Sequence, residues 1–201
     1  MMDTIKNKIR EYKGKFHVYW VWIKSLKRNK YKTASLRYKE MINNLPLEWR
    51  SILDVGCWFW DIIPYICSHT NKFSYLWVDM IQEFIDVAKQ KYPDFEFITG
   101  EYFKNNQIKK KFDIVLCCGA LNSNFKNVIE YRKKSIKKMF DSCNECVVFN
   151  MAWWFAIKNK KESKVYYADI HQVLEYCLSL TQKTIFKSHY SEKDFTIYMF
   201  K

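Results

Sequence analysis

From residue 51 to the end of the chain, short apolar runs alternate with amphipathic stretches, and this alternation limits the folds that the chain can adopt. The apolar runs have the length of buried strands. In the stretches between them apolar residues recur at helical spacing, as where Ile81, Phe84 and Ile85 fall at i, i+3 and i+4. Strands that alternate with helices favour an α/β sandwich with a mostly parallel sheet.

The expected elements follow one another as βαβαβ and then as β, α, β, α, β, β. We expect strands at Ser51–Val55, Tyr75–Val78, Phe95–Thr99, Phe112–Cys118, Glu145–Met151, Thr184–His189 and Phe195–Phe200. We expect helices at 60–69, 81–91 and 126–141, and a further helix from an N-cap at Asp169 to about Leu180. No helix separates the last two strands, so they are predicted to form an antiparallel hairpin at one edge of the sheet.

Residues 1–50 precede the first expected strand and have a helical pattern, so we expect a basic helical cap over 1–50 and an α/β domain over 51–201. The cap carries 13 Lys/Arg against 4 Asp/Glu, whereas residues 51–201 carry 21 against 17. Such a basic segment is typical of a surface for an anionic partner such as RNA. A chain that is rich in Lys throughout shows the same excess without a partner, and both interpretations stay open.

The composition excludes several classes of protein. Hydrophobic residues are 49% of the chain, which is enough for a core, and the 27% of charged residues with only 3 Pro exclude a disordered chain. No apolar run reaches the roughly 18 residues of a transmembrane helix, and the charged start has no apolar h-region. The sequence therefore predicts a cytoplasmic protein without a membrane partner, whose 7 Cys are mostly reduced thiols.

The most specific local pattern is the segment ILDVGCWFWD at residues 52–61. It begins with the end of an apolar run, which contains Asp54 and is followed by Gly56. It resembles motif I of the class I S-adenosylmethionine-dependent methyltransferases, in which G-x-G-x-G follows such a strand in the turn to the first helix. Asp54, Gly56 and Cys57 match this pattern, while Trp58 and Trp60 stand at the second and third Gly.

Further segments match the same family in the same order. Residues 76–79 (LWVD) resemble the end of its second strand, and residues 97–101 (FITGE) resemble its third strand. Residues 112–122 resemble its fourth strand with the loop after it, and residues 167–198 resemble its last helix and terminal hairpin. The resemblance implies a Rossmann-like methyltransferase fold: a seven-stranded, mostly parallel sheet with an antiparallel C-terminal hairpin and a helical N-terminal cap.

The resemblance also implies an enzyme that transfers a methyl group from S-adenosylmethionine to an acceptor. In such a site the glycine turn lets the backbone approach the cofactor, and free N–H groups at the following helix N-terminus face it. Asp54 would hold the methionine end, Asp79 would accept both ribose hydroxyls, and Glu101 would read the adenine amino group. The residues implied to bind the cofactor are Arg37, Asp54, Gly56, Cys57, Trp58, Asp79, Met80, Glu101, Tyr102, Cys118 and Gly119.

Two of these residues have alternative interpretations. Asp54 at a strand end is also compatible with a structural cap, and Arg37, the implied partner of the cofactor carboxylate, is also compatible with a solvated surface residue. The implied role of Tyr102 is to cover the adenine ring, and Cys118 with Gly119 would form the floor beneath the sulfonium.

No catalytic residue is predicted, because the sulfonium is already activated and alignment for in-line displacement is the main task. A metal is not expected, since the 4 His are scattered and Cys143 with Cys146 form a single C-x-x-C without a second pair. The polar candidates near the expected mouth of the site are Tyr19, Asn122, Tyr166 and Tyr167.

The tryptophans raise a question about activity. The chain has only 4 Gly but 8 Trp, and Trp58, Trp60 and Trp77 stand where the family has Gly. Bulky residues in the motif I turn would fill the space of the cofactor, and a left-handed backbone is unfavourable for them. We therefore hypothesise that UGA codons read as Gly in the source were translated as Trp, with Trp20, Trp22, Trp153 and Trp154 as further candidates.

Two other interpretations remain. The chain is alternatively a catalytically dead methyltransferase-fold protein that binds RNA or a protein partner through its basic N-terminal segment. A nucleotide-binding oxidoreductase is a third class, but it requires G-x-G-x-x-G and lacks the terminal hairpin. The acceptor is not identified; a small molecule, RNA and protein are the classes considered. The family implies that residues 1–50, 119–127 and 151–168 select it.

Overall fold

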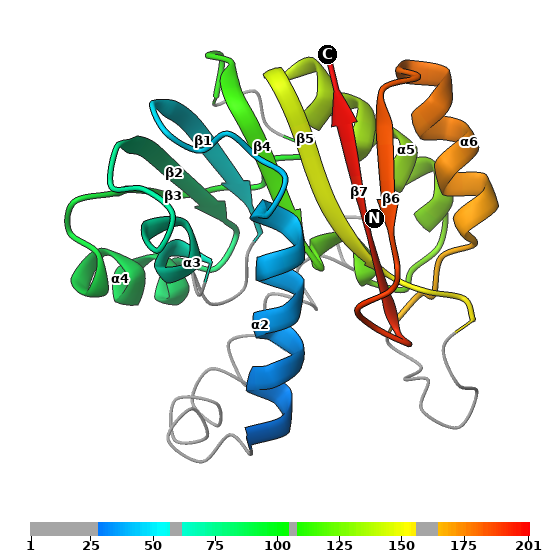
Figure 1. Cartoon of the computed structure of the whole chain (residues 1–201), viewed down its shortest axis with the longest axis horizontal. Helices are drawn as coiled ribbons and strands as arrows, with labels where there is room; N and C mark the ends of the chain where they lie inside the picture. The colour runs from blue at the N-terminus through cyan, green and yellow to red at the C-terminus, as the bar shows by residue number, and fades with distance from the viewer. Residues whose placement is uncertain (1–27, 57–61, 105–107, 156–164) are drawn as a thin grey trace.

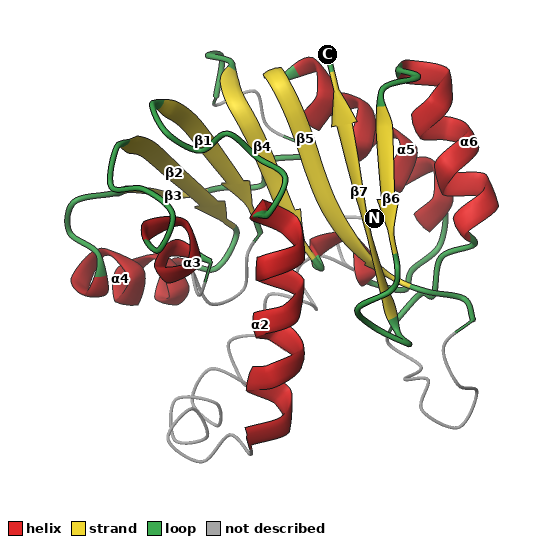
Figure 2. Cartoon of the chain, viewed as in Figure 1, coloured by secondary structure: helices red, strands yellow, loops and turns green. Residues whose placement is uncertain are grey.

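The computed structural model describes residues 28–56, 62–104, 108–155 and 165–201, which form one seven-stranded sheet with helices on both faces (Figures 1 and 2). The strands are β1 (Arg50–Val55), β2 (Phe73–Asp79), β3 (Glu96–Thr99), β4 (Phe112–Cys118), β5 (Cys143–Ala152), β6 (Thr184–Lys187) and β7 (Asp194–Phe200). The helices are α2 (Arg28–Ile42), α3 (Ile63–Cys67), α4 (Gln82–Lys91), the 3-10 turn η1 (Ala120–Asn122), α5 (Val128–Asp141) and α6 (Ile170–Leu180).

The strand order is β3-β2-β1-β4-β5-β7-β6. Strands β1 to β5 pair in parallel, β7 runs antiparallel to β5, and β6 runs antiparallel to β7. The expected mostly parallel sheet with an antiparallel C-terminal hairpin is therefore confirmed. Because the chain order reverses between β1 and β4, their carboxyl ends border the crevice in which open α/β sheets bind ligands.

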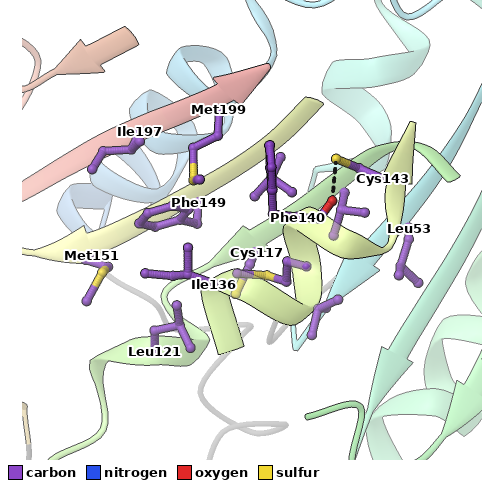
Figure 3. Close-up of a cluster of buried hydrophobic side chains, with 14 of the residues drawn as sticks. Leu53, Cys117, Leu121, Ile136, Phe140, Cys143, Phe149, Met151, Ile197 and Met199 are labelled. Atoms are coloured by element: carbon purple, nitrogen blue, oxygen red, sulfur yellow. Dashed lines mark hydrogen bonds between the residues drawn. The ribbon is translucent and has the colours of Figure 1, made fainter. Parts of the chain in front are cut away.

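Both faces of the sheet are covered, which explains why its central strands are apolar throughout. Along β4, Ile114 and Leu116 belong to a core under α2, α3 and α4, whereas Val115 and Cys117 belong to a core under α5 and α6. Figure 3 shows the second core, in which Ile136 and Phe140 of α5 lie against the strands.

The predicted helices and strands are present, with shifts at their ends. Asp169 is the N-cap of α6 as expected, because its carboxylate accepts the backbone N–H of His171 at 2.9 Å. The helix expected at 60–69 is described only from residue 62 onward, where α3 spans Ile63–Cys67 with Pro64 in its first turn. Strand β5 begins earlier than expected, at Cys143, and β6 ends earlier, at Lys187.

Helix α2 is the described part of the expected cap, and polar side chains attach it to the terminal hairpin. The guanidinium of Arg37 donates to the carboxylate of Asp194 at 2.9 Å, and Lys187 Nζ lies 3.2 Å from the carboxylate of Glu40. Among the described residues, none of the helices is long and apolar enough to cross a membrane.

Candidate functional site

The loops after β1 and β4 meet at Gly56. This residue has a φ of +67°, and its N–H donates to the carbonyl of Val78 at the end of β2, at 2.9 Å. A Cβ on Gly56 would lie 2.8 Å from Cβ of Ala120, closer than real contacts allow. Both the backbone conformation and the close approach of Ala120 therefore require glycine here.

Asp54 lies directly below this turn, at the buried end of β1. The hydroxyl of Tyr75 on β2 donates to its Oδ2 at 2.6 Å. The sequence pattern does not reveal this contact, because Tyr75 reads simply as part of an apolar strand. The contact holds the Asp54 carboxylate between β1 and β2.

Asp79 ends β2 and is 6% exposed. Its Oδ1 accepts the N–H of Ile81 at 3.0 Å, and its main-chain carbonyl accepts the N–H of Gly100 at 2.8 Å. Burial raises the pKa of Asp79 to about 7, against the lowering effect of the backbone hydrogen bonds. The carboxyl group is therefore anchored at one oxygen and changes charge near neutral pH.

Glu101 follows the β3 strand and lies near this edge of the sheet. Its half-buried carboxylate forms an ion pair with Lys104 at 3.0 Å. The side chain of Tyr102 takes the opposite direction: it is buried, its ring lies 5.0 Å from Nζ of Lys138 on α5, and burial raises its pKa to about 12. The expectation that the Tyr102 ring covers a bound base therefore does not agree with its position in the second core.

Cys118 ends β4 and Gly119 directly follows it, as expected. Gly119 has a φ of +70°, and its N–H lies 3.4 Å from the carbonyl of Asn150 on β5. Burial raises the pKa of the Cys118 thiol to about 12, so this thiol is neutral at physiological pH. The half-buried Met80 packs against the first core beside these loops.

Arg37 projects from α2 toward the same end of the sheet. Its Nε and Nη2 both donate to Oδ2 of Asp194, each at 2.9 Å, and the Asp194 side chain is 3% exposed. The interpretation of Arg37 as a solvated surface residue is therefore wrong. A role of Arg37 toward the cofactor carboxylate stays a prediction.

The candidates at the mouth of the site bind other loops. Asn122 accepts the N–H of Ala152 at its side-chain oxygen, at 2.8 Å, and its main-chain carbonyl accepts the N–H of Tyr166 at 2.9 Å. It therefore connects the loop after β4 with the segments that follow β5. Tyr167 is half-buried in the same segment, and Tyr19 lies outside the described residues.

The sequence did not single out Arg132 of α5, which is only 4% exposed. Its guanidinium donates to the carbonyl of Leu121 at 2.8 and 2.6 Å and to the carbonyl of Tyr166 at 3.0 Å, and it lies 4.4 Å from the centre of the Tyr166 ring. Burial lowers its pKa to about 10. Arg132 thus holds the two loops beside the crevice together. The signal in the sequence was hidden, because Arg132 stands within a run of basic residues.

Two tryptophans differ in their surroundings. Trp77, at a usual Gly place, is fully buried, and its ring packs edge-on against Phe97 with 5.9 Å between the centres. Trp49 is 71% exposed and has a φ of +63°, a conformation that favours glycine and is an outlier for a bulky side chain. The motif I residues Cys57, Trp58 and Trp60 lie outside the described residues, as do Trp20 and Trp22.

Metal ligation has no candidate in the described ranges, because they hold no group of three or more His, Cys, Asp or Glu placed around a common point. The pair Cys143 and Cys146 lies buried in β5. Burial raises the pKa of the Cys143 thiol to about 11 and that of Cys146 further. Both groups are therefore neutral core thiols.

Comparisons with known proteins place this geometry in context. No family model matches the chain. A segment of 67 residues is 33% identical to "Putative methyltransferase 235L" of Invertebrate iridescent virus 6. The match spans 33% of this chain and only a quarter (25%) of the length of that relative.

Solved structures match over most of the chain. The DhpI–SAH complex superposes with a TM-score of 0.70 at 10% identity, over 96% of this chain and 95% of that chain. An S-adenosylmethionine-dependent methyltransferase from Clostridium acetobutylicum ATCC 824 gives 0.62 at 14% identity, over 93% and 97%. Magnesium protoporphyrin IX methyltransferase from Synechocystis PCC 6803 with bound SAM gives 0.62 at 13% identity, over 85% and 78%. The chain therefore has the Rossmann-like fold of S-adenosylmethionine-dependent methyltransferases.

Proposed function

We propose that the protein is an S-adenosylmethionine-dependent methyltransferase that transfers a methyl group to an unidentified acceptor. The observation that carries the proposal is the meeting of Asp54, Gly56 and Asp79 at the carboxyl ends of β1 and β2, opposite Gly119 after β4. Solved proteins of the same fold hold the cofactor or its demethylated product, S-adenosylhomocysteine.

The described residues fit this cofactor. Gly56 provides the left-handed turn and the close approach to Ala120 that any Cβ would prevent, and Asp79 presents a carboxyl that suits a vicinal diol. We assign Asp79 to the ribose hydroxyls, Glu101 to the adenine amino group and Asp54 to support of the methionine end. The further proposed contacts are Arg37, Cys57, Met80, Cys118, Gly119 and the backbone at the position of Trp58.

When bound, the cofactor supplies an activated sulfonium methyl group, so the protein's task is to orient the acceptor and exclude water. Asn122 and Arg132 keep the loops after β4 and β5 in one arrangement. The raised pKa of Cys118 keeps its thiol protonated, and a protonated thiol does not compete with the acceptor as a nucleophile.

The second candidate is a catalytically dead protein of the same fold. Trp58 and Trp60 favour this candidate if Trp is the natural residue at both positions. A small molecule, RNA and protein remain the proposed acceptor classes for the active enzyme, and its cytoplasmic location stays a prediction. The two candidates differ in whether glycine at these positions is the natural state.

Calorimetry with S-adenosylmethionine separates the two candidates. We expect no binding by the sequence as it stands and binding by Trp58→Gly with Trp60→Gly, because the indoles leave the turn. Asp79→Ala in the double variant is expected to abolish cofactor binding again. Lys89→Ala, at an exposed position of α4, is expected to leave cofactor binding unchanged. Failure of the folded double variant to bind would overturn the proposal.

Two further measurements complete this test. UGA codons at positions 58 and 60 support the decoding hypothesis, and UGG codons at both contradict it. If the double variant binds the cofactor, transfer of a labelled methyl group to pools of RNA, protein and small molecules then identifies the acceptor class.

A further inference from the structure

The basic charge after residue 50 is concentrated in one segment. Residues 104–141 carry 10 Lys/Arg against 3 Asp/Glu, a net charge of +7, whereas residues 51–201 as a whole have a net charge of only +4. The rest of the α/β domain is therefore slightly acidic. General Lys richness of the chain does not explain such an uneven distribution.

Helix α5 turns this charge outward. Its apolar side chains, among them Ile136 and Phe140, point into the second core (Figure 3). Lys134 and Lys137 are exposed on the other side, with Lys133 and Lys138 half-buried beside them. Positions three and four apart lie on one face of a helix, so these lysines form a continuous basic stripe.

An open groove of about 560 Å³ lies along this stripe. The four lysines line it together with Ile108 and Tyr176 of α6, and the acids at its border are Glu130 and Asp141. The exposed Lys109, Lys110 and Lys111 directly follow Ile108 at the rim. We refer to these lysines, Ile108 and Tyr176 as the α5 groove.

The exposed Lys134 and Lys137 are the groove lysines that are most accessible to an anion, whereas Lys138 Nζ already donates to the carbonyl of Tyr102 at 2.5 Å. Lys137 pairs with Asp141 at 2.8 Å, but both side chains are 56% exposed, so replacing this partner by a phosphate costs little. Lys133 Nζ lies 5.5 Å from the centre of the Tyr176 ring. Groove and rim together present seven lysines against two acids.

We propose that the α5 groove binds the phosphate backbone of a single-stranded nucleic acid. Regularly spaced lysines are point charges that attract successive phosphates without reading sequence. Tyr176 adds an aromatic ring on which a base can stack, and the combination of a basic groove with an aromatic platform is typical of single-strand binding.

The chemistry of the groove favours a nucleic acid over a membrane surface. Binding in a membrane interface requires a broad apolar face next to the basic one. Ile108 is the single aliphatic side chain that lines the described groove, and it is half-buried. An anionic vesicle and an acidic polypeptide therefore serve as competing partners in the test.

The groove is separate from the proposed methyl-transfer site. The N-terminal part of α5 lies near the loop after β4, where Arg132 contacts Leu121, but its end lies at the opposite edge of the sheet, where the carbonyl of Ser142 accepts the N–H of Phe112. The exposed Lys134 and Lys137 lie on a different side of α5 from the core-facing Ile136 and Phe140, and Lys138 is the groove lysine that reaches the chain next to Glu101. The proposal goes beyond methyl transfer and does not depend on it.

The test is fluorescence anisotropy of a labelled single-stranded RNA of about 20 nucleotides, titrated with the full chain at salt from about 50 to about 200 mM. We expect Lys134→Glu with Lys137→Glu to weaken binding at least about tenfold and to reduce the salt slope by about 2. The control is Lys89→Glu with Lys91→Glu on α4, which makes the same change of charge at exposed helical positions. We expect this control to bind as the unchanged chain does.

Several outcomes overturn the proposal. These are absence of RNA binding by the unchanged chain, an equal loss in both pairs of variants, and no loss in the groove pair. Tighter binding to phosphatidylserine vesicles or to polyglutamate than to RNA also overturns it. If the groove pair does not fold, Lys109→Gln with Lys111→Gln at the rim takes its place, with a loss of at least about threefold expected.

Discussion

At the residue scale, the same side-chain type serves different purposes according to where it lies. Trp77 fills the first core beside Phe97, whereas Trp49 is exposed in a left-handed conformation. A substitution that looks identical in the sequence, Trp to Gly, therefore removes core packing at one position and backbone strain at the other. The structure adds Trp49 to the positions that favour glycine, and it sets Trp77 apart from them.

We expect Trp77→Gly to lower the free energy of unfolding by at least about 3 kcal/mol, because it leaves a large cavity. Trp49→Gly is expected to raise it by about 1 kcal/mol, because the left-handed backbone no longer carries a side chain. Urea unfolding of both variants checks this. An unchanged stability of Trp77→Gly would contradict the packing role of this indole in the first core.

Asp79 makes stability depend on pH. Its pKa of about 7 in the folded chain lies above the ordinary value of 3.8, so between these values the folded state binds more protons than the unfolded state. The free energy of unfolding therefore falls as pH rises through this window, by up to about 4 kcal/mol, and is constant above it. Asp79→Asn removes this dependence. Urea unfolding at several pH values measures how the free energy of unfolding of each variant depends on pH. Asp86→Asn, at an exposed position of α4, is the control.

At the element scale, helix α5 carries two surfaces with different tasks. One side packs Ile136 and Phe140 into the core and directs Arg132 at the carbonyls of Leu121 and Tyr166. The other side presents lysines to solvent. A basic side chain on this helix is therefore a loop clamp or a surface charge, depending only on which side of the helix it projects from.

We expect Arg132→Met to destabilise the protein by about 3 kcal/mol, because the buried carbonyl of Leu121 and the part-buried carbonyl of Tyr166 lose their donor. Lys134→Met, two positions further on the exposed side, is expected to change stability by less than about 0.5 kcal/mol. Urea unfolding measures both, and limited proteolysis should show faster cleavage in the loops after β4 and β5 of Arg132→Met alone. Equal stability and equal proteolysis of the two variants would contradict the role of Arg132 in holding the two loops together.

At the scale of the whole molecule, an ion pair connects the first described helix, α2, with the last strand, β7. Arg37 on α2 and Asp194 at the start of β7 are 157 residues apart in the chain, and Asp194 is almost fully buried. Their ion pair positions α2 over the carboxyl ends of the central strands. The placement of the cap therefore depends on the formation of the terminal hairpin.

A double-mutant cycle with Arg37→Met and Asp194→Asn tests this link. We expect a coupling of about 1–2 kcal/mol, because one partner is buried and the other is partly exposed to solvent. Amide hydrogen exchange in α2 should accelerate in both single variants, while exchange in α4 on the same face stays unchanged. Additive effects with unchanged α2 exchange would refute the link.

The order of the strands and helices, the terminal hairpin and the N-cap at Asp169 could all be predicted from the sequence. These features depend on local periodicity and on hydrogen bonds between near neighbours, which the sequence displays directly. The positions of Asp54, Gly56, Asp79 and Gly119 at the carboxyl ends of β1, β2 and β4 could also be predicted, because the carboxyl ends of parallel strands share one edge.

The environment of each side chain depended on the tertiary structure. Contacts between residues far apart in the chain produce four features of the site. These are the hydrogen bond from Tyr75 to Asp54, the burial of Arg132, the orientation of the Tyr102 ring and the ion pair of Arg37. Burial and charge partners set the protonation of Asp79 and Cys118, and no local pattern encodes them. The sequence by itself therefore determined the order of the elements and the edge at which the site lies. The tertiary structure decided which polar groups face that site and which hold its loops, because this choice depends on packing between distant segments.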